Sequence, residues 1–199
     1  MKSEPVRPYR MVARAESAAA TAERIMDAYA ELFTQRPSDQ IGLDQVAALA
    51  GVTVQTVLRR FGSKEKLFAA TTKREAGRVR DDRFTVTPGD VAGAVANLID
   101  HYEEMGDLVM RMLGEEERVP AIKEITDNGR RLHRDWCEKV FAPFLPPAGS
   151  DTGDRRRAQF VAICDVYTWK LLRRDSALSR RRTEAAIVEM LAPFTKEPL

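Results

Sequence analysis

The stretch GLDQVAALAGVTVQTVLRRF at residues 42–61 constrains the fold of this chain most strongly, because it encodes two short helices joined by one tight turn. Apolar residues recur with helical spacing over residues 43–50, and Gly51 tolerates the positive φ that ends many helices. Thr53 is a favourable N-cap for a second helix over residues 54–61. The stretch therefore predicts a compact pair of helices with a fixed turn between them.

The neighbouring residues predict the apolar support that such a helix pair needs. Ala47 is small where the two helices must approach closely, and Val57 lies where the second helix packs back. Residues 21–35 have the amphipathic spacing of a longer helix that can act as a platform. Ser63 is placed to cap a further helix, whose apolar face begins at Leu67. Together these segments predict a small helical domain.

The rest of the chain is predicted to be helical as well. Residues 85–89, Thr-Val-Thr-Pro-Gly, interrupt the pattern and mark a domain boundary. Helical spacing then recurs at about residues 89–104, 105–117, 120–142, 154–174 and 180–194, with a break expected at Gly106. No segment alternates as a strand does, so we expect an all-α chain. Its predicted parts are a flexible basic arm (1–16), a three-helix domain (17–84) and a second helical domain (85–199).

Charge is distributed unevenly between these parts. Residues 1–80 hold 14 Lys or Arg and 9 Asp or Glu, a net charge of +5, whereas residues 81–199 carry −3. The excess favours a first part that faces nucleic acid and a second part with another task. Arg7, Arg10 and Arg14 of the arm suit a DNA minor groove, although a disordered, solubilising tail is the favoured interpretation.

The cysteines and the N-terminus bear on the compartment. Cys137 and Cys164 are the only cysteines, and both have apolar neighbours, so we expect reduced, buried thiols. The first residues lack the apolar core of a secretion signal, and no apolar stretch approaches the roughly 18 residues of a membrane span. We expect a cytoplasmic protein with no membrane association.

The helix pair resembles a known family once its surroundings are included. The run GLDQVAALAGVTVQTVLRRFGSKEKLF, preceded by ERIMDAYAELF, is similar to the N-terminal domain of the tetracycline-repressor (TetR/AcrR) family. The positions that carry the likeness are Val46, Ala47, Ala50, Gly51, Val52, Thr53, Phe61, Ser63, Lys64, Glu65 and Leu67. The resemblance covers roughly residues 20–80, and beyond it only the length and helical character agree. It implies a helix-turn-helix that binds DNA.

Helix geometry indicates which side chains face the DNA in such a domain. Gln55, Thr56 and Arg59, with Val54 and Arg60, project toward the groove, where Gln suits adenine and Arg suits guanine. Gln45, Thr53 and Lys64 are better placed for backbone phosphates. The arginine pair can contact either bases or phosphates, and Val54 can equally be a packing residue. Leu58 departs from the family, which commonly has a phosphate-contacting Tyr there.

The resemblance assigns the second domain to dimerisation and ligand binding. A homodimer doubles the DNA site and explains a palindromic operator. The expected dimer interface comprises Phe160, Cys164, Leu171, Ile187, Met190, Leu191 and Phe194. The expected pocket, for a small apolar or aromatic effector, comprises Tyr102, Met105, Met112, His133, Trp136, Cys137, Phe141 and Tyr167. Aromatic and methionine residues at helical spacing more often fill a protein core than line a ligand pocket.

Two other function classes are alternatives to this regulator, which in this family is usually a repressor released by its effector. An architectural, weakly specific DNA-binding protein without an effector would need a broader basic surface than residues 81–199 offer. An enzyme is not expected, since the chain has no G-x-S-x-G, H-E-x-x-H, P-loop or Rossmann glycine motif. His101, His133 and Cys137 lack a fourth ligand, so neither a metal site nor a cofactor is expected.

Overall fold

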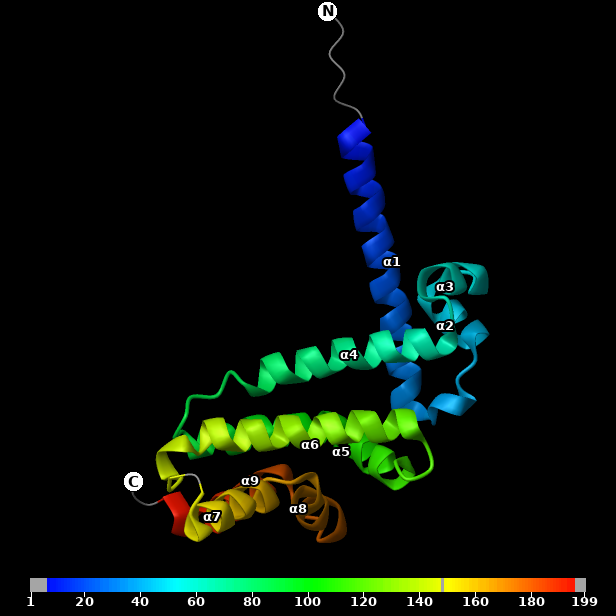
Figure 1. The fold of residues 1–199 in the computed structure, drawn as a ribbon. Helices are drawn as coiled ribbons and strands as arrows, with labels where there is room; N and C mark the ends of the chain where they lie inside the picture. Colours follow the sequence, from blue (N-terminus) through cyan, green and yellow to red (C-terminus); the bar gives the residue numbers. More distant parts are fainter. Residues whose placement is uncertain (1–6, 148, 196–199) are drawn as a thin grey trace, which may run out of the picture. The chain divides into compact units, whose positions relative to one another are not determined.

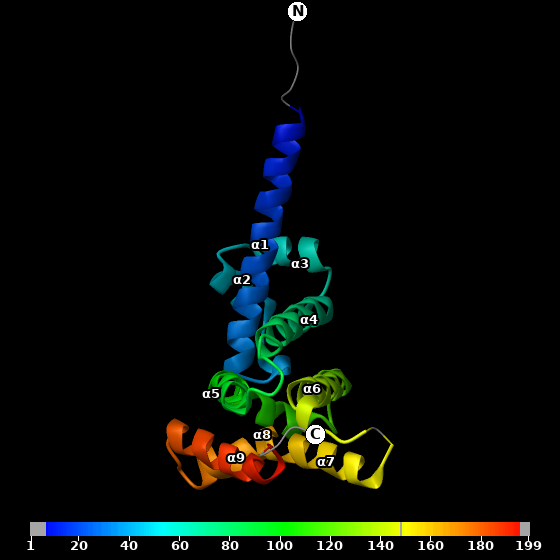
Figure 2. The same ribbon diagram turned by 90° about the vertical axis from the view of Figure 1, so that its left-hand side faces the viewer.

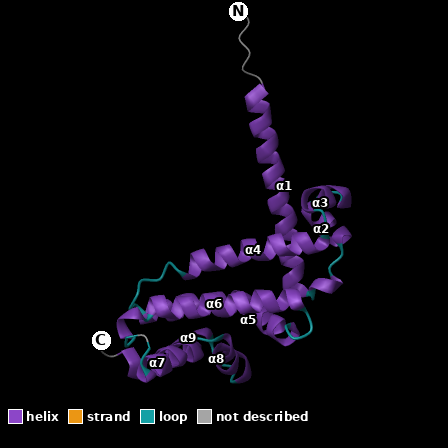
Figure 3. Ribbon diagram, in the orientation of Figure 1, coloured by secondary structure: helices purple, strands orange, loops and turns teal. Residues whose placement is uncertain are grey.

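The computed structural model describes residues 7–147 and 149–195, and within these ranges it is helical and contains no strand (Figure 3). The predicted all-α fold class is therefore confirmed. Two compact units divide between Glu75 and Ala76, inside α4 (Lys64–Arg83). No helix in the described ranges has an apolar stretch long enough to cross a lipid bilayer.

The first unit is built around α1 (Arg7–Gln35), on which α2 (Leu43–Ala50) packs, and α3 (Val54–Phe61) packs on α2 (Figure 1). Its core buries Ile25, Tyr29, Val46, Val57 and Leu67, each at most 1% exposed. The Arg24 Nε donates to the Ala50 carbonyl over 3.4 Å, which joins α1 to the end of α2. The predicted platform and helix pair are confirmed.

The first helix begins earlier than predicted. We expected a flexible arm over residues 1–16, but residues 7–16 form the first turns of α1. Pro8 is compatible with this position, because a helix's first N–H groups have no intrahelical partner and the proline ring sets a helical φ. The Ala-rich stretch that follows has high helix propensity. Residues 1–6 of the predicted arm lie outside the described residues.

The second unit packs the remaining helices around two tryptophans. The helices α5 (Val91–Glu115) and α6 (Pro120–Val140) lie side by side, and α7 (Asp151–Ile163), α8 (Val166–Lys170) and α9 (Arg180–Thr195) pack beneath them (Figure 2). Trp136 and Trp169 are fully buried, and the Phe141 and Phe160 rings stack 4.3 Å apart.

Two helix ends in this unit differ from the prediction. The predicted break at Gly106 is wrong, because α5 is continuous through this residue. Gly106 does not end the helix but is buried against the Trp169 ring. The single helix expected at 154–174 is divided. Cys164 ends α7, and the Asp165 carboxylate accepts a hydrogen bond from the Tyr167 N–H over 3.0 Å to begin α8. A π-helical segment (Leu171–Asp175) follows.

The two units also divide nine residues before the boundary we placed at residue 85. The end of α4 packs within the second unit, where the Arg83 guanidinium lies 4.4 Å from the centre of the Trp136 ring. The Trp136 Nε1 donates to the Arg83 carbonyl over 2.9 Å. Since α4 is continuous across the division, one helix carries residues of both units.

Candidate nucleic-acid interface and ligand region

The turn between α2 and α3 is fixed by local hydrogen bonds. Gly51 has φ 65° and ψ 39°, a left-handed conformation that side chains other than glycine rarely adopt. The Val52 N–H donates to the Ala47 carbonyl over 2.9 Å, which closes the end of α2. The Thr53 hydroxyl accepts from the Thr56 N–H over 3.2 Å and caps α3. The direction of α3 is therefore set by residues 51–56.

One face of α3 is buried and the other is exposed. Val57 is 1% exposed and anchors the helix in the core of the first unit. The exposed side chains include four of the predicted groove-facing residues: Val54, Gln55, Arg59 and Arg60. Leu58 is also exposed on α3, at 37%. The arrangement presents amide and guanidinium groups together on a short, capped helix.

The predicted phosphate-contacting residues have roles in the fold as well. The Gln45 Oε1 accepts from the Gly42 N–H over 3.1 Å and helps to cap α2, which leaves its amide nitrogen to donate elsewhere. The Lys64 Nζ donates to the Asp39 carbonyl over 3.4 Å. Thr53 and Thr56 share a 3.0 Å hydroxyl contact. These residues therefore stabilise the pair α2 and α3, and Lys64 adds positive charge beside it.

The predicted pocket residues are mostly packed. Tyr102, Met112, His133, Trp136, Cys137 and Phe141 are buried, Met105 is half-buried and Tyr167 is 52% exposed. The Tyr102 hydroxyl donates to the Cys164 carbonyl over 3.0 Å, and ring contacts join Trp136 to Phe141. In this conformation these side chains fill the core of the second unit, where we had expected them to line one cavity.

A groove of about 630 Å³, which the sequence did not lead us to expect, instead lies along α6 and α7. Its volume falls in the range of small-molecule sites. The residues that line it are Arg134, Asp135, Cys137, Glu138, Leu145, Arg157, Ala158, Phe160, Val161 and Ala162. Cys137 is the one predicted pocket residue among them. The charged members look like an ordinary solvated helix face in the sequence, so no local signal pointed to them.

The pKa values of two histidines in this region are shifted in opposite directions. Burial, together with the charges of Arg83 and His133, lowers the pKa of His101 to about 3, so His101 is neutral at physiological pH. The His133 Nε2 lies 3.1 Å from the Val161 carbonyl and 3.8 Å from the Cys137 Sγ. Burial disfavours its charged form, but its contacts with Cys137 outweigh burial and raise the pKa of His133.

The predicted dimer residues separate into two sets. Phe160, Cys164, Ile187 and Leu191 are each at most 1% exposed and fill the core of the protomer, which leaves no side-chain surface for a partner. Phe194 is half-buried against Phe160. Leu171 and Met190 are 59% and 41% exposed, and Tyr167 joins them as a third large exposed apolar side chain of this unit.

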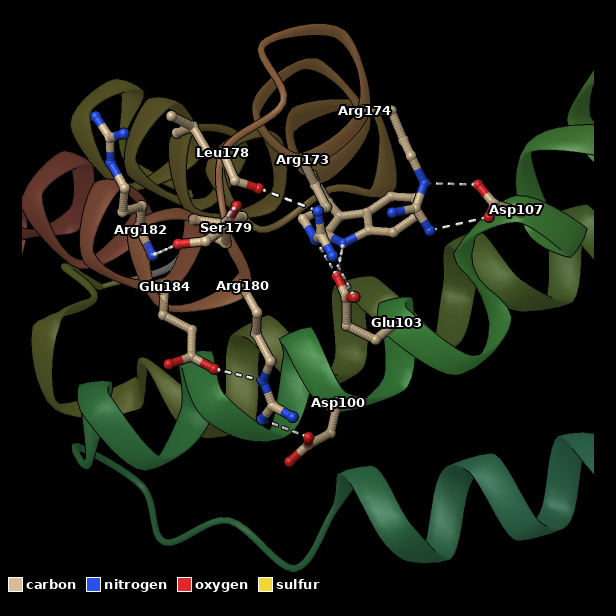
Figure 4. A network of polar contacts seen from close by, with 12 residues as sticks. Asp100, Glu103, Asp107, Arg173, Arg174, Leu178, Ser179, Arg180, Arg182 and Glu184 are labelled. Atoms are coloured by element: carbon tan, nitrogen blue, oxygen red, sulfur yellow. Dashed lines mark hydrogen bonds and ion pairs between the residues drawn. The ribbon is translucent and has the colours of Figure 1, made fainter.

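Ion pairs hold the segment that carries Leu171 against α5 (Figure 4). Arg173 pairs with both carboxylate oxygens of Glu103, and Arg174 pairs with both oxygens of Asp107. The Glu103 carboxylate also accepts from the Trp169 Nε1. Arg180 at the start of α9 pairs with Asp100. The acids at 100, 103 and 107 follow helical spacing, so one face of α5 holds the segment that carries Leu171 and the start of α9.

The comparisons with known proteins agree with this architecture. Residues 25–71 match the family model described as bacterial regulatory proteins, tetR family. An uncharacterized HTH-type transcriptional regulator of Mycobacterium tuberculosis is 40% identical over 178 residues, which cover 86% of each chain.

Solved structures share the fold at lower identity. A tetR-family transcriptional regulator from Streptomyces coelicolor has a TM-score of 0.66 and 19% identity, covering 87% of this chain and 81% of its own. NalD of Pseudomonas aeruginosa, described as the secondary repressor of the MexAB-OprM multidrug efflux pump, has a TM-score of 0.50 and 18% identity, covering 92% and 98%.

Proposed function

Because the chain belongs to the TetR family of DNA-binding transcriptional regulators, we propose that it is a repressor. It binds a palindromic operator as a homodimer in the cytoplasm, and a small apolar or aromatic molecule releases it. One structural neighbour, NalD, is itself described as a repressor. The alternative is a weakly specific DNA-binding protein without an effector.

The observation that carries the proposal is the exposed face of α3. Gln55 and Arg59 are exposed on a helix whose opposite side is anchored by Val57. Glutamine and arginine can each make bidentate contacts with base edges in the major groove, and such contacts distinguish base pairs. A helix of eight residues reaches only a few base pairs. Specific binding therefore requires two copies of α3, one for each half-site of a palindrome.

The exposed apolar residues of the second unit supply a surface for that pairing. Tyr167, Leu171 and Met190 come from α8, the π-helical segment and α9. Large apolar side chains that remain exposed favour association with another protein surface. In a two-fold dimer the same surface of each protomer faces the other, so a single set of residues serves both protomers. The ion pairs with α5 keep the Leu171 segment in one orientation.

The groove along α6 and α7 is the proposed effector site. Leu145 and Val161 offer apolar contacts, and Arg134 and Arg157 can orient a polar group of the ligand. The groove replaces the packed cluster around Trp136 as the candidate site. An effector changes operator affinity only if it binds the DNA-bound and free conformations with different affinity.

Selection of bound sites from random duplex DNA, repeated with a panel of small aromatic molecules, tests the proposal. We expect enrichment of one palindromic sequence, and loss of that enrichment when an effector is present. Enrichment of a palindrome that no molecule in the panel weakens supports DNA recognition and contradicts release by effectors of this class. Absence of any enriched sequence contradicts the regulator proposal and favours the weakly specific alternative.

A further inference from the structure

A buried arginine that the proposed function does not use lies at the end of α4, within the second unit. Arg83 is 3% exposed, although arginine is almost never fully buried unless it is paired. Its Nε and Nη2 are buried and have no hydrogen-bond partner among the described residues. A buried charge without a counter-charge lowers the stability of the fold, so its presence requires an explanation.

Trp136 holds the Arg83 side chain in place without satisfying these donors. The Cζ of Arg83 lies 4.4 Å from the centre of the Trp136 ring, and the Trp136 Nε1 donates to the Arg83 carbonyl over 2.9 Å. Trp136 is itself fully buried. An aromatic ring attracts a cation through its face, but it has no oxygen that could accept a hydrogen bond from the guanidinium. The guanidinium is therefore fixed in position with one edge unbound.

The acids that precede Arg83 in the sequence do not neutralise it. Asp81 and Asp82 are exposed, and adjacent positions of a helix do not face each other. The charge of Arg83 acts on its surroundings instead: burial, followed by the charges of Arg83 and His133, lowers the pKa of His101 to about 3. The end of α4 therefore places uncompensated positive charge in the second unit.

The unbound edge of Arg83 has the geometry that binds a carboxylate. Nε and Nη2 lie on one side of a guanidinium and direct two parallel N–H groups outward. The same two atoms of Arg173 lie 2.8 and 3.1 Å from the two carboxylate oxygens of Glu103 (Figure 4). Those of Arg174 lie 3.1 and 2.9 Å from the two oxygens of Asp107. Arg83 presents this edge without a protein carboxylate.

We propose that Arg83 binds the carboxylate of a small organic acid. Its single positive charge and its two parallel donors match the single negative charge and the two oxygens of a monocarboxylate. Because the guanidinium is buried against Trp136, an acid with an aromatic or aliphatic body is favoured over a hydroxylated one.

This site is separate from the groove along α6 and α7, because Arg83 is not among the residues that line the groove. The inference goes beyond the proposed function and requires neither DNA nor an effector in the groove. Failure of the carboxylate site would therefore leave the repressor proposal intact, and the reverse also holds. A bound acid supplies the missing counter-charge, so it should stabilise the folded chain.

Calorimetric titration of the full-length protein at constant sodium concentration tests the proposal with benzoate, phenylacetate and octanoate. Benzamide, phenylacetamide and octanamide are the matched controls, because they keep the shape of each acid without its charge. We expect at least one acid to bind and to raise the thermal unfolding temperature, and its amide to do neither. Inorganic phosphate should bind at least about tenfold more weakly than that acid.

Two variants assign the binding to Arg83. Arg83→Met removes the charge and should weaken binding of the acid at least about tenfold. Arg83→Lys keeps the charge but loses the paired N–H groups, so it should also bind more weakly than the wild-type chain.

Stability without ligand separates a binding role from a structural one. Arg83→Met should be at least as stable as the wild-type chain in urea, because no protein carboxylate loses its partner. Arg173→Met is the matched control and should be less stable, since it removes the ion pair of Glu103.

The comparison of acids with amides uses the wild-type chain alone, so it does not depend on the variants folding. Binding of none of the three acids, equal responses to acid and amide, or tighter binding of phosphate than of any acid overturns the proposal. Undiminished binding of the acid by Arg83→Met also overturns it, because the carboxylate would then lie elsewhere in the chain.

Discussion

Gly106 on α5 lies against the Trp169 ring so closely that a Cβ at position 106 would come within 2.5 Å of two ring carbons. Trp169 is fully buried, and its Nε1 donates to Glu103. The ring therefore has little freedom to move away. A glycine in the middle of a 25-residue helix is thus explained by close packing between α5 and α8.

We predict that Gly106→Ala destabilises the second unit. Overpacking a well-packed core costs about 1–3 kcal/mol, which exceeds the gain in helix propensity of about 1 kcal/mol. Gly114→Ala is the matched control, because it lies in the same helix with no atom within 4 Å of its Cβ. It should stabilise the protein by about 0.5–1 kcal/mol. Urea unfolding measures both, and an equally stable Gly106→Ala protein would contradict the packing argument.

We predict that Arg59→Ala weakens operator binding by about 1–3 kcal/mol and relaxes the preference at one base pair, if Arg59 reads a guanine. Its side chain is exposed on α3 and free to enter a groove. Arg155→Ala, an exposed arginine on α7, is the control and should bind normally. Fluorescence anisotropy against single-base variants of the operator measures the effect. A uniform loss with a shallower salt dependence assigns Arg59 to a phosphate instead.

We predict that Leu58→Tyr strengthens binding to all DNA sequences by about 1 kcal/mol, since a phenol hydroxyl can donate to a charged phosphate. Leu58 is 37% exposed on α3, so a larger side chain has room there. Leu58→Phe is the matched control, because it adds the ring without the hydroxyl. Equal affinities of the Tyr and Phe variants would show that no phosphate lies within reach.

We predict that stability falls as the pH drops below about 6.5, the pKa of an unfolded histidine. The pKa of His101 is lowered to about 3 in the folded chain, so the unfolded chain binds the extra proton between these values. The contribution of His101 to the free energy of unfolding is fully present above the pKa of the unfolded histidine. About 2 kcal/mol of it is lost by about pH 5. His101→Gln should show a correspondingly smaller loss in urea unfolding between pH 7 and pH 5, and identical pH profiles would contradict this assignment.

We predict that Leu171→Glu converts a dimer into a monomer. Leu171 is 59% exposed on the surface proposed for pairing, and burying a carboxylate there, once from each protomer, opposes association. Leu49→Glu, at an exposed apolar position of the first unit, is the control and should leave the dimer intact. Sedimentation velocity measures the mass, and a Leu171→Glu dimer as stable as wild type would remove this surface from the interface.

The helix pair could be predicted almost residue by residue, because local chemistry sets its ends. Gly51 and Thr53 stop one helix and start the next within three residues, and the structure confirms the predicted ranges 43–50 and 54–61. The exposure of Gln55, Arg59 and Arg60 followed from the same local geometry. No distant contact was needed for these inferences.

The second unit was harder to predict, because its helix ends depend on packing. Gly106 suggests a break by composition, yet Trp169, more than sixty positions away, needs the space that a glycine leaves. Asp165 begins α8 inside a stretch whose apolar spacing favoured one long helix. Helical spacing along the sequence predicts neither the packing of Trp169 on Gly106 nor the capping of α8 by Asp165.

The candidate ligand site could not be predicted from helical periodicity either. Tyr102, Trp136 and Phe141 are buried as their spacing suggests, but spacing does not distinguish a packed core from the wall of a cavity. The groove is bordered by Arg134 and Arg157, which in the sequence resemble an ordinary solvated surface.

Binding of the selected palindrome tests the central claim most directly, measured in competition with random duplex and with the same site carrying one scrambled half. At physiological salt we predict two chains on each palindrome and an affinity at least about 10³-fold above that for random duplex. The duplex with one scrambled half should lose most of that preference, because only one of the two copies of α3 then meets its matching bases. Equal affinity for all three duplexes would contradict the assignment of α3 as a sequence-reading helix.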